Sequence, residues 1–202
     1  MRTIGFLGVL VLSLVTAQIA GAASVSTGMA DWQLVELPAG APGTIGTAPV
    51  ITTPNGAWNN SLAVGGVKWI GPTKDANLVG LEGTYKYELS LVLPAGTYAL
   101  NAAFTSDNMV ASFKLNGIEL LPAPQTDTYS FKKTFNVAGQ GTSPLTLDVE
   151  VINSPLGGSA SNPTGLIVSG NVTAVPLPAA AWAGMGLLGA LGSFKVLRRR
   201  AA

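Results

Sequence analysis

The chain has 202 residues, of which 48% are apolar and only 10% are charged, and it contains neither histidine nor cysteine. Without cysteine there are no disulfides, thiolate metal sites or cysteine nucleophiles, and without histidine there is no Ser-His-Asp triad and no histidine-ligated zinc or haem. The apolar content argues against a disordered chain, and the length suits one domain.

The formal net charge of +1 conceals an uneven distribution of charge. Cations occupy the two ends of the chain, at Arg2 and within residues 195–200. The middle holds six lysines, no arginine and all ten acidic residues, which gives it a net charge of −4. Because cationic contacts to phosphate dominate nucleic-acid affinity, we expect no nucleic-acid partner.

The N-terminus has the pattern of a secretory signal peptide, predicted as a helix within residues 1–23. A positive start precedes an apolar stretch at residues 4–15. Small residues at Ala20 and Ala22 form a cleavage site, and Ala23 completes an alternative site one residue later. An uncleaved anchor is the other interpretation, but the apolar stretch is shorter than the ~20 residues that a spanning helix needs.

The C-terminus, residues 175–202, has three parts in a fixed order. It starts with the pentapeptide Val175, Pro176, Leu177, Pro178 and Ala179, continues with 16 apolar residues at 179–194, and ends with the basic residues Lys195, Arg198, Arg199 and Arg200. A helix over residues 179–197 would be ~28 Å long, close to the ~30 Å thickness of the bilayer hydrocarbon. The basic residues predict a cytoplasmic end for this transmembrane helix.

This order of motif, apolar helix and arginine cluster resembles the PEP-CTERM protein-sorting signal of Gram-negative bacteria. The pentapeptide is similar to the VPLPA-type variant, which has Leu177 where the parent motif has glutamate. The resemblance implies that the tail holds an exported precursor transiently in the inner membrane. An exosortase would then cut near the motif, and the protein would proceed to the outer surface or the extracellular polysaccharide. An ordinary single-pass anchor is the alternative.

Residues 24–174, between these ends, show a period-two alternation of apolar and polar residues. It is clearest at residues 85–93, 111–115, 129–137 and 145–151. Such alternation predicts strands with one buried and one solvated face. Asn116 and Gly117 form a typical two-residue hairpin turn. The predicted fold is therefore all-β, an antiparallel β-sandwich or jelly roll.

The order of short motifs in this body also resembles a galactose-binding-like jelly-roll domain. The pieces that match are residues 69–72, 85–93, 93–96, 105–108, 113–117, 131–137 and 162–166. Residues 24–65 match less clearly, and we place Trp32 and Trp58 in the first strands and their connection.

Asp107 and Asn108 follow a predicted strand and are candidate ligand-binding residues. Their clustered oxygens suit a structural Ca²⁺ ion or a sugar hydroxyl. An Asx-turn, in which the side chain bonds to nearby backbone, is the alternative. We predict no other metal site and no cofactor.

Trp58 and Trp69 are candidates for an aromatic platform on which a sugar ring stacks, because tryptophan supplies a large rigid surface. The alternative is that both rings fill the interior. Tyr85 and Tyr87 alternate with Leu89 on one face and are predicted to point into the core.

Glycoside hydrolysis needs two carboxyl groups across a sugar site. Asp148 and Glu150 instead share the outer face of one predicted strand, which is the ordinary pattern of a solvated surface, so we expect no enzymatic activity. The predicted function is that of a secreted, exosortase-sorted, non-catalytic surface or extracellular-matrix protein associated with exopolysaccharide. The alternatives are a carbohydrate-binding module with a defined sugar site and a carboxylate-dependent glycoside hydrolase.

Overall fold

The computed structural model contains eleven strands and no helix in the part of the chain that it describes. The described residues are 22–75, 80–94, 97–126, 132–139, 144–154 and 162–175. The predicted all-β fold is confirmed for these residues. Within them, no helix has the length and apolar character needed to cross a membrane. The predicted tail helix lies outside the described residues, as does the predicted signal-peptide helix except for Ala22 and Ala23, which belong to a strand.

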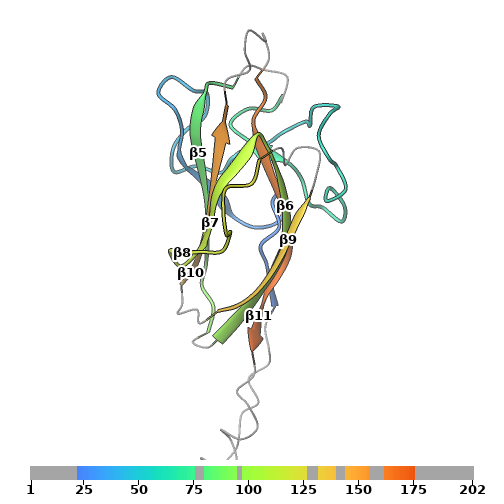
Figure 1. Ribbon diagram of the computed structural model, residues 1–202, viewed down its shortest axis with the longest axis vertical. Coiled ribbons are helices and arrows are strands. Elements are labelled where there is room, and N and C mark those ends of the chain that lie inside the picture. The colour runs from blue at the N-terminus through green and yellow to red at the C-terminus, as the bar shows by residue number, and fades with distance from the viewer. Residues whose placement is uncertain are drawn as a thin grey trace, which may run out of the picture.

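The strands form two antiparallel sheets that face each other (Figure 1). The six-stranded sheet contains β1 (Ala22–Ser24), β3 (Val50–Ile51), β4 (Ile70–Gly71), β6 (Thr97–Asp107), β9 (Lys133–Gly139) and β11 (Gly165–Val175). The five-stranded sheet contains β2 (Trp32–Glu36), β5 (Gly83–Leu91), β7 (Met109–Leu115), β8 (Ile118–Glu119) and β10 (Leu145–Asn153). The neighbour orders are β3-β4-β11-β6-β9, with β1 also on β11, and β2-β5-β10-β7-β8.

The predicted alternation holds in β5 and β10, which pair along their full lengths from Leu145 opposite Leu91 to Asn153 opposite Gly83. Every second residue of β10, starting at Leu145, is buried. Tyr85 and Tyr87 of β5 are fully buried, which confirms their predicted core positions. The alternate residues of both strands form the outer face of the five-stranded sheet.

The core lies between the two sheets, and large apolar side chains from both meet there. Phe104 of β6 and Phe113 of β7 have ring centroids 5.5 Å apart and are both fully buried. Leu166 and Val168 of β11 join the same cluster. This contact joins the two sheets, and burying a side chain of this size stabilises the fold by about 1.5–3 kcal/mol.

Strands β6 and β11 pair through eleven residues, from Gly165 opposite Asp107 to Val175 opposite Thr97. Alternation of apolar and polar residues did not predict these two strands from the sequence. The first four residues of β11 are all buried, because a second apolar cluster covers the outer face there. A strand buried on both faces shows no alternation.

The Asn116-Gly117 turn between β7 and β8 is confirmed. Both residues have positive φ, 49° and 77°, and Leu115 pairs with Ile118 across them. This is the type I′ geometry that asparagine and glycine tolerate best. The side chain of Asn116 also accepts a 2.7 Å hydrogen bond from the backbone N–H of Thr146, which fixes the turn to β10.

Some element bounds differ from the prediction. Strand β5 ends at Leu91, and β9 runs over Lys133–Gly139; the earlier predicted residues 129–131 lie outside the described ranges. Strand β1 starts at Ala22, within the predicted signal peptide, and β11 includes Val175, the first residue of the pentapeptide. The remaining pentapeptide residues, Ala20 and the basic tail residues 195–200 lie outside the described residues.

Candidate functional site

Asp107 ends β6 and is buried, with an exposed fraction of 4%. Its Oδ2 accepts a 2.6 Å hydrogen bond from the indole N–H of Trp58, 49 residues earlier in the chain. Its Oδ1 accepts a hydrogen bond from the amide of Asn108. Its backbone oxygen accepts one from the hydroxyl of Thr164, at 3.0 Å. Asp107 therefore ties β6 to two distant segments rather than only to its own turn.

Burial raises the pKa of Asp107 to about 6, and the hydrogen bond from Trp58 opposes this rise. Removing a carboxylate from water disfavours its charged form, whereas a donor hydrogen bond favours it. The carboxyl group therefore changes charge near pH 6 within a closed environment. It accepts hydrogen bonds from side chains of the protein on both of its oxygens.

Trp58 and Trp69 lie on the outer face of the six-stranded sheet, beneath their own connecting segment. Their ring centroids are 4.3 Å apart, with 37° between the ring planes. The Trp58 ring lies over Gly165, where a Cβ atom would come within 2.7 Å of it. The indole N–H of Trp69 donates to Asn60 at 2.9 Å. We call Trp58, Leu62, Val67, Trp69 and Ile167 the outer cluster.

This burial corrects the sugar-platform hypothesis for the two tryptophans. Trp58 is 4% exposed and Trp69 is 1% exposed. Neither ring offers a free face on which a sugar could stack, and the interior interpretation holds for both. Both rings are needed to cover a sheet face that would otherwise be apolar and open to water.

Beside Asp107, a set of asparagine side chains closes the end of the sandwich. Asn108 Oδ1 accepts from the backbone N–H of Ser154 at 2.9 Å. Asn153 donates to the backbone oxygens of Leu81 and Asn162, at 3.2 and 3.3 Å. The side-chain oxygens of Asn153 and Asn162 are buried and have no hydrogen-bond partner among the described residues.

The sequence analysis identified Asp107 and Asn108 but not Asn153 or Asn162. Asn153 is the last residue of a strand and gives no motif that could have revealed it. No group of three or more acidic residues that could hold a metal lies together among the described residues. The Ca²⁺ site at Asp107 therefore stays a prediction.

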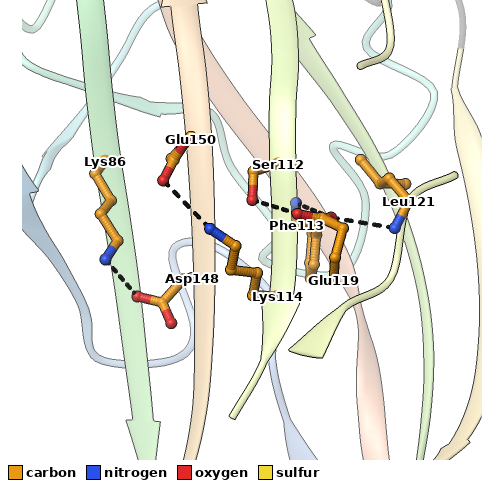
Figure 2. A network of polar contacts seen from close by, with 8 residues as sticks. All are labelled: Lys86, Ser112, Phe113, Lys114, Glu119, Leu121, Asp148 and Glu150. Carbon is orange, nitrogen blue, oxygen red and sulfur yellow. Dashed lines mark hydrogen bonds and ion pairs between the residues drawn. The ribbon is translucent and has the colours of Figure 1, made fainter. Parts of the chain in front are cut away.

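The outer face of the five-stranded sheet carries a second set of polar residues, which we call the polar face (Figure 2). It consists of Lys86 on β5, Ser112 and Lys114 on β7, Glu119 on β8, and Asp148 and Glu150 on β10. Lys86 Nζ lies 2.9 Å from Asp148 Oδ1. Lys114 Nζ lies 3.7 Å from Glu150 Oε1. The four charged side chains of these pairs are 13–35% exposed.

Glu119 is the most firmly held residue of the polar face. Its carboxylate accepts from the hydroxyl of Ser112 at 2.6 Å and from the backbone N–H groups of Phe113 and Leu121, at 2.9 and 3.2 Å (Figure 2). Partial burial raises the pKa of Glu119, but these three hydrogen bonds and the charge of Lys114 outweigh it and lower the pKa below its ordinary value. Glu119 is therefore fixed in its charged form.

Asp148 and Glu150 lie on the polar face as predicted from their shared strand register. Each forms an ion pair with a lysine of a neighbouring strand. Opposite charges side by side on neighbouring strands are the ordinary way in which a sheet surface is stabilised. This arrangement gives no support to a catalytic carboxyl pair.

A search of protein-family models and a search of curated proteins found no match to this chain. Among solved structures, it is similar to a CBM35 from Paenibacillus barcinonensis, with a TM-score of 0.36 and 16% identity over 77% of this chain and 99% of that one. A family 35 carbohydrate-binding module from Clostridium thermocellum gives a TM-score of 0.35 and 12% identity, over 76% and 98% of the two chains.

A third similar structure is TmCBM61 in complex with β-1,4-galactotriose. Its TM-score is 0.33 and its identity 16%, over 47% of this chain and 67% of that one. The galactotriose is a ligand of that protein.

Proposed function

We propose that this domain is a non-catalytic carbohydrate-binding module and that the polar face is its sugar-contact surface. The observation that carries the proposal is the arrangement of partly exposed ammonium and carboxylate groups side by side on a sheet, already paired with one another. The buried hydroxyl of Ser112 holds Glu119 beside them. Asp107 and Asn108, by contrast, hydrogen-bond to neighbouring segments at one end of the sandwich, and ligand binding there stays a prediction.

Sugar hydroxyls both donate and accept hydrogen bonds, so a surface that binds them must offer both kinds of partner. Lys86 and Lys114 donate, whereas Asp148, Glu150 and Glu119 accept. Hydrogen bonds that involve charged groups are stronger than neutral ones. Because the side chains are held by their neighbours before any ligand arrives, little conformational entropy is lost on binding.

Recognition on this surface would rest on hydrogen bonds and not on ring stacking. The exposed large hydrophobic residues within the described side chains are all aliphatic, Met29 and Val92 among them. An extended polysaccharide fits such a face better than a compact ligand, because the face lies open along neighbouring strands and is not a pocket lined by aromatic groups.

The test is binding of the secreted protein to polysaccharides, on a glycan array and by affinity electrophoresis. We expect Lys114→Met and Glu150→Gln each to weaken binding about tenfold to a hundredfold, since a hydrogen bond to a charged group contributes about 1.5–3 kcal/mol. The matched control is Asn101→Ala, an exposed residue on the outer face of the other sheet, at which binding stays unchanged.

Thermal unfolding of each variant shows whether the fold is intact. Binding that is lost equally in the Asn101 control, or retained in both polar-face variants, rules out this surface. Turnover of a polysaccharide that a single Asp or Glu substitution abolishes would replace the proposal with the hydrolase alternative.

We further propose that the domain is exported and held in the inner membrane by its tail until an exosortase-type enzyme releases it to the surface or the extracellular polysaccharide. The last described strand ends at Val175, where the pentapeptide begins, and the first starts at Ala22, at the proposed signal cleavage site.

Mass spectrometry of the mature protein tests this itinerary. We expect an N-terminus near residues 23–24 and a C-terminus within residues 175–179. A mature protein that still ends at Ala202 would leave the plain single-pass anchor. Replacing Arg198, Arg199 and Arg200 with alanine is expected to weaken membrane retention or change the orientation of the tail.

A further inference from the structure

Strand β11 spans the sandwich and defines its two ends. At one end Val175 pairs with Thr97, and at the other Gly165 pairs with Asp107. Eleven residues at ~3.3 Å per residue separate these ends by ~33 Å. We call the end with Ala22, Thr97 and Val175 the terminal end, and the end with Leu81, Asp107 and Gly165 the hairpin end.

Both apolar segments of the sequence join the fold at the terminal end. Ala22 pairs with Thr173, two residues before β11 ends at Val175, so Ala22 and Val175 lie close together. The apolar stretch at residues 4–15 precedes the first of these points, and the one at residues 179–194 follows the second. Whichever of the two segments is in a bilayer, it attaches to the same end of the sandwich.

The tether on the C-terminal side is short. Four residue steps connect Val175 to Ala179, where the predicted transmembrane helix starts, and fully extended they span at most ~14 Å. This is less than half the ~33 Å length of β11. The terminal end must therefore stay close to the headgroups, while the hairpin end lies beyond the reach of the tether.

The chemistry of the terminal end suits a lipid interface. The pairings place residues 22–24, Leu91, Thr97, Leu145 and Val175 at this end, and all of these residues are uncharged. Asp31 is the charged residue nearby, one position before Trp32, which pairs with Leu89. Val92 is 88% exposed and Val175 is 38% exposed. Placing uncharged and aliphatic groups against headgroups avoids the large cost of removing a charge from water.

From this geometry we propose that the terminal end of the sandwich is a lipid-facing surface, which rests on the outer leaflet while the protein is tethered. The inference rests on the proposed membrane tether. The hairpin end then points away from the bilayer, and the polar face stands roughly upright, accessible along its whole length.

The absence of native cysteine makes a direct test possible. Two variants are made, Val92→Cys on the terminal end and Leu81→Cys on the hairpin end. The single cysteine of each variant is labelled with an environment-sensitive fluorophore. The full chain is reconstituted in phosphatidylethanolamine–phosphatidylglycerol vesicles that contain a headgroup-attached quencher. We expect severalfold stronger quenching at residue 92 than at residue 81, and loss of this difference after the domain is cut from its tail.

The outcomes separate the orientation from the tether. Equal quenching at both positions, or stronger quenching at residue 81, in a chain that resists extraction from the vesicles overturns the orientation and leaves the tether standing. A chain that alkaline carbonate washes off the vesicles overturns both. Circular dichroism of the two labelled variants confirms that the fold is intact, and both positions are exposed in the native protein.

Discussion

Asp107 and Trp58 show how a buried charge is accommodated in this protein. The carboxyl group is 4% exposed, and it accepts hydrogen bonds from the amide of Asn108 and, at 2.6 Å, from the indole N–H of Trp58. Burial raises the pKa of Asp107 to about 6, because hydrogen bonds from neutral donors compensate only part of the lost hydration. Asp107 therefore makes stability depend on pH in the direction opposite to that of most carboxyl groups.

The first prediction concerns this pH dependence. The pKa of Asp107 is about 6 in the folded protein and 3.8 as its ordinary value. Between these values the folded state binds more protons than the unfolded state, so the contribution of Asp107 to the free energy of unfolding falls as pH rises. Wild type should therefore lose stability relative to Asp107→Asn as pH rises. We expect the difference in the free energy of unfolding between the two proteins to change by about 1–3 kcal/mol from pH 4 to pH 7, in favour of the variant, as measured by urea denaturation. A constant difference between the two proteins would contradict the raised pKa.

The second prediction isolates the indole donor. Trp58→Phe keeps an aromatic ring but leaves Oδ2 of Asp107 without this hydrogen bond, so we expect a loss of about 1–3 kcal/mol at pH 7. At pH 4, where the carboxyl group is protonated, the loss should be smaller. The control is Trp69→Phe, because the indole N–H of Trp69 donates to the neutral amide oxygen of Asn60. An equal loss at both pH values would show that only packing was affected.

At this scale the sequence drew attention to Asp107, Asn108 and the two tryptophans, but not to the contacts between them. The cluster of Asp107 and Asn108 was visible as a polar turn, and the tryptophans stood out by type. The pairing of Asp107 with Trp58 joins positions 49 residues apart, and local spacing holds no information about such contacts. The burial of both indoles depends on a connection that folds back across a sheet, which periodicity cannot reveal.

Among the elements, β6 and β11 lie close together at Gly170, which pairs with Ala102. A Cβ atom at Gly170 would meet the backbone oxygen of Asn101 and come within 2.7 Å of Ala102 Cα. Because these are backbone atoms of the neighbouring strand, they cannot move aside without separating the two strands. The glycine here is required by the close approach and not by its φ angle.

Gly170→Ala is therefore expected to destabilise the fold by about 1–3 kcal/mol, as overpacking of a filled interior does. Gly56→Ala is the matched control, since a Cβ atom at Gly56 meets nothing within 4 Å. Thermal and urea denaturation of the two variants, side by side, measures the difference. If both variants lose equal stability, the strands have more freedom to separate than the structure indicates.

The elements that alternate could be predicted from sequence, and those buried on both faces could not. Strands β5, β7 and β10 have one solvated face, and their alternation gave their positions to within two residues. In β11 the outer cluster covers Gly165 to Val168, so the pattern is lost. In β6 the many small residues, such as Ala99 and Ala103, carry too little hydrophobicity to mark a face.

For the whole molecule, the uneven distribution of charge becomes a measurable property. The precursor has a net charge of +1 and an isoelectric point near 8.0. The body between the two ends holds all the acidic residues. Two of these residues, Asp148 and Glu150, form ion pairs with lysines on the polar face. The cations that offset the body lie only in the segments proposed to be removed.

Isoelectric focusing of the protein recovered from the cell surface would then test both proposed cleavages. The body alone has six lysines and ten acidic residues, and its net charge of −4 predicts focusing well on the acidic side of pH 7. Retention of the tail would add Lys195, Arg198, Arg199 and Arg200 and bring the net charge to zero, which shifts focusing toward neutrality. The uncut precursor should focus near 8.0. A released form that focuses at or above neutrality would contradict removal of the tail, because no other segment holds enough basic residues to balance the body.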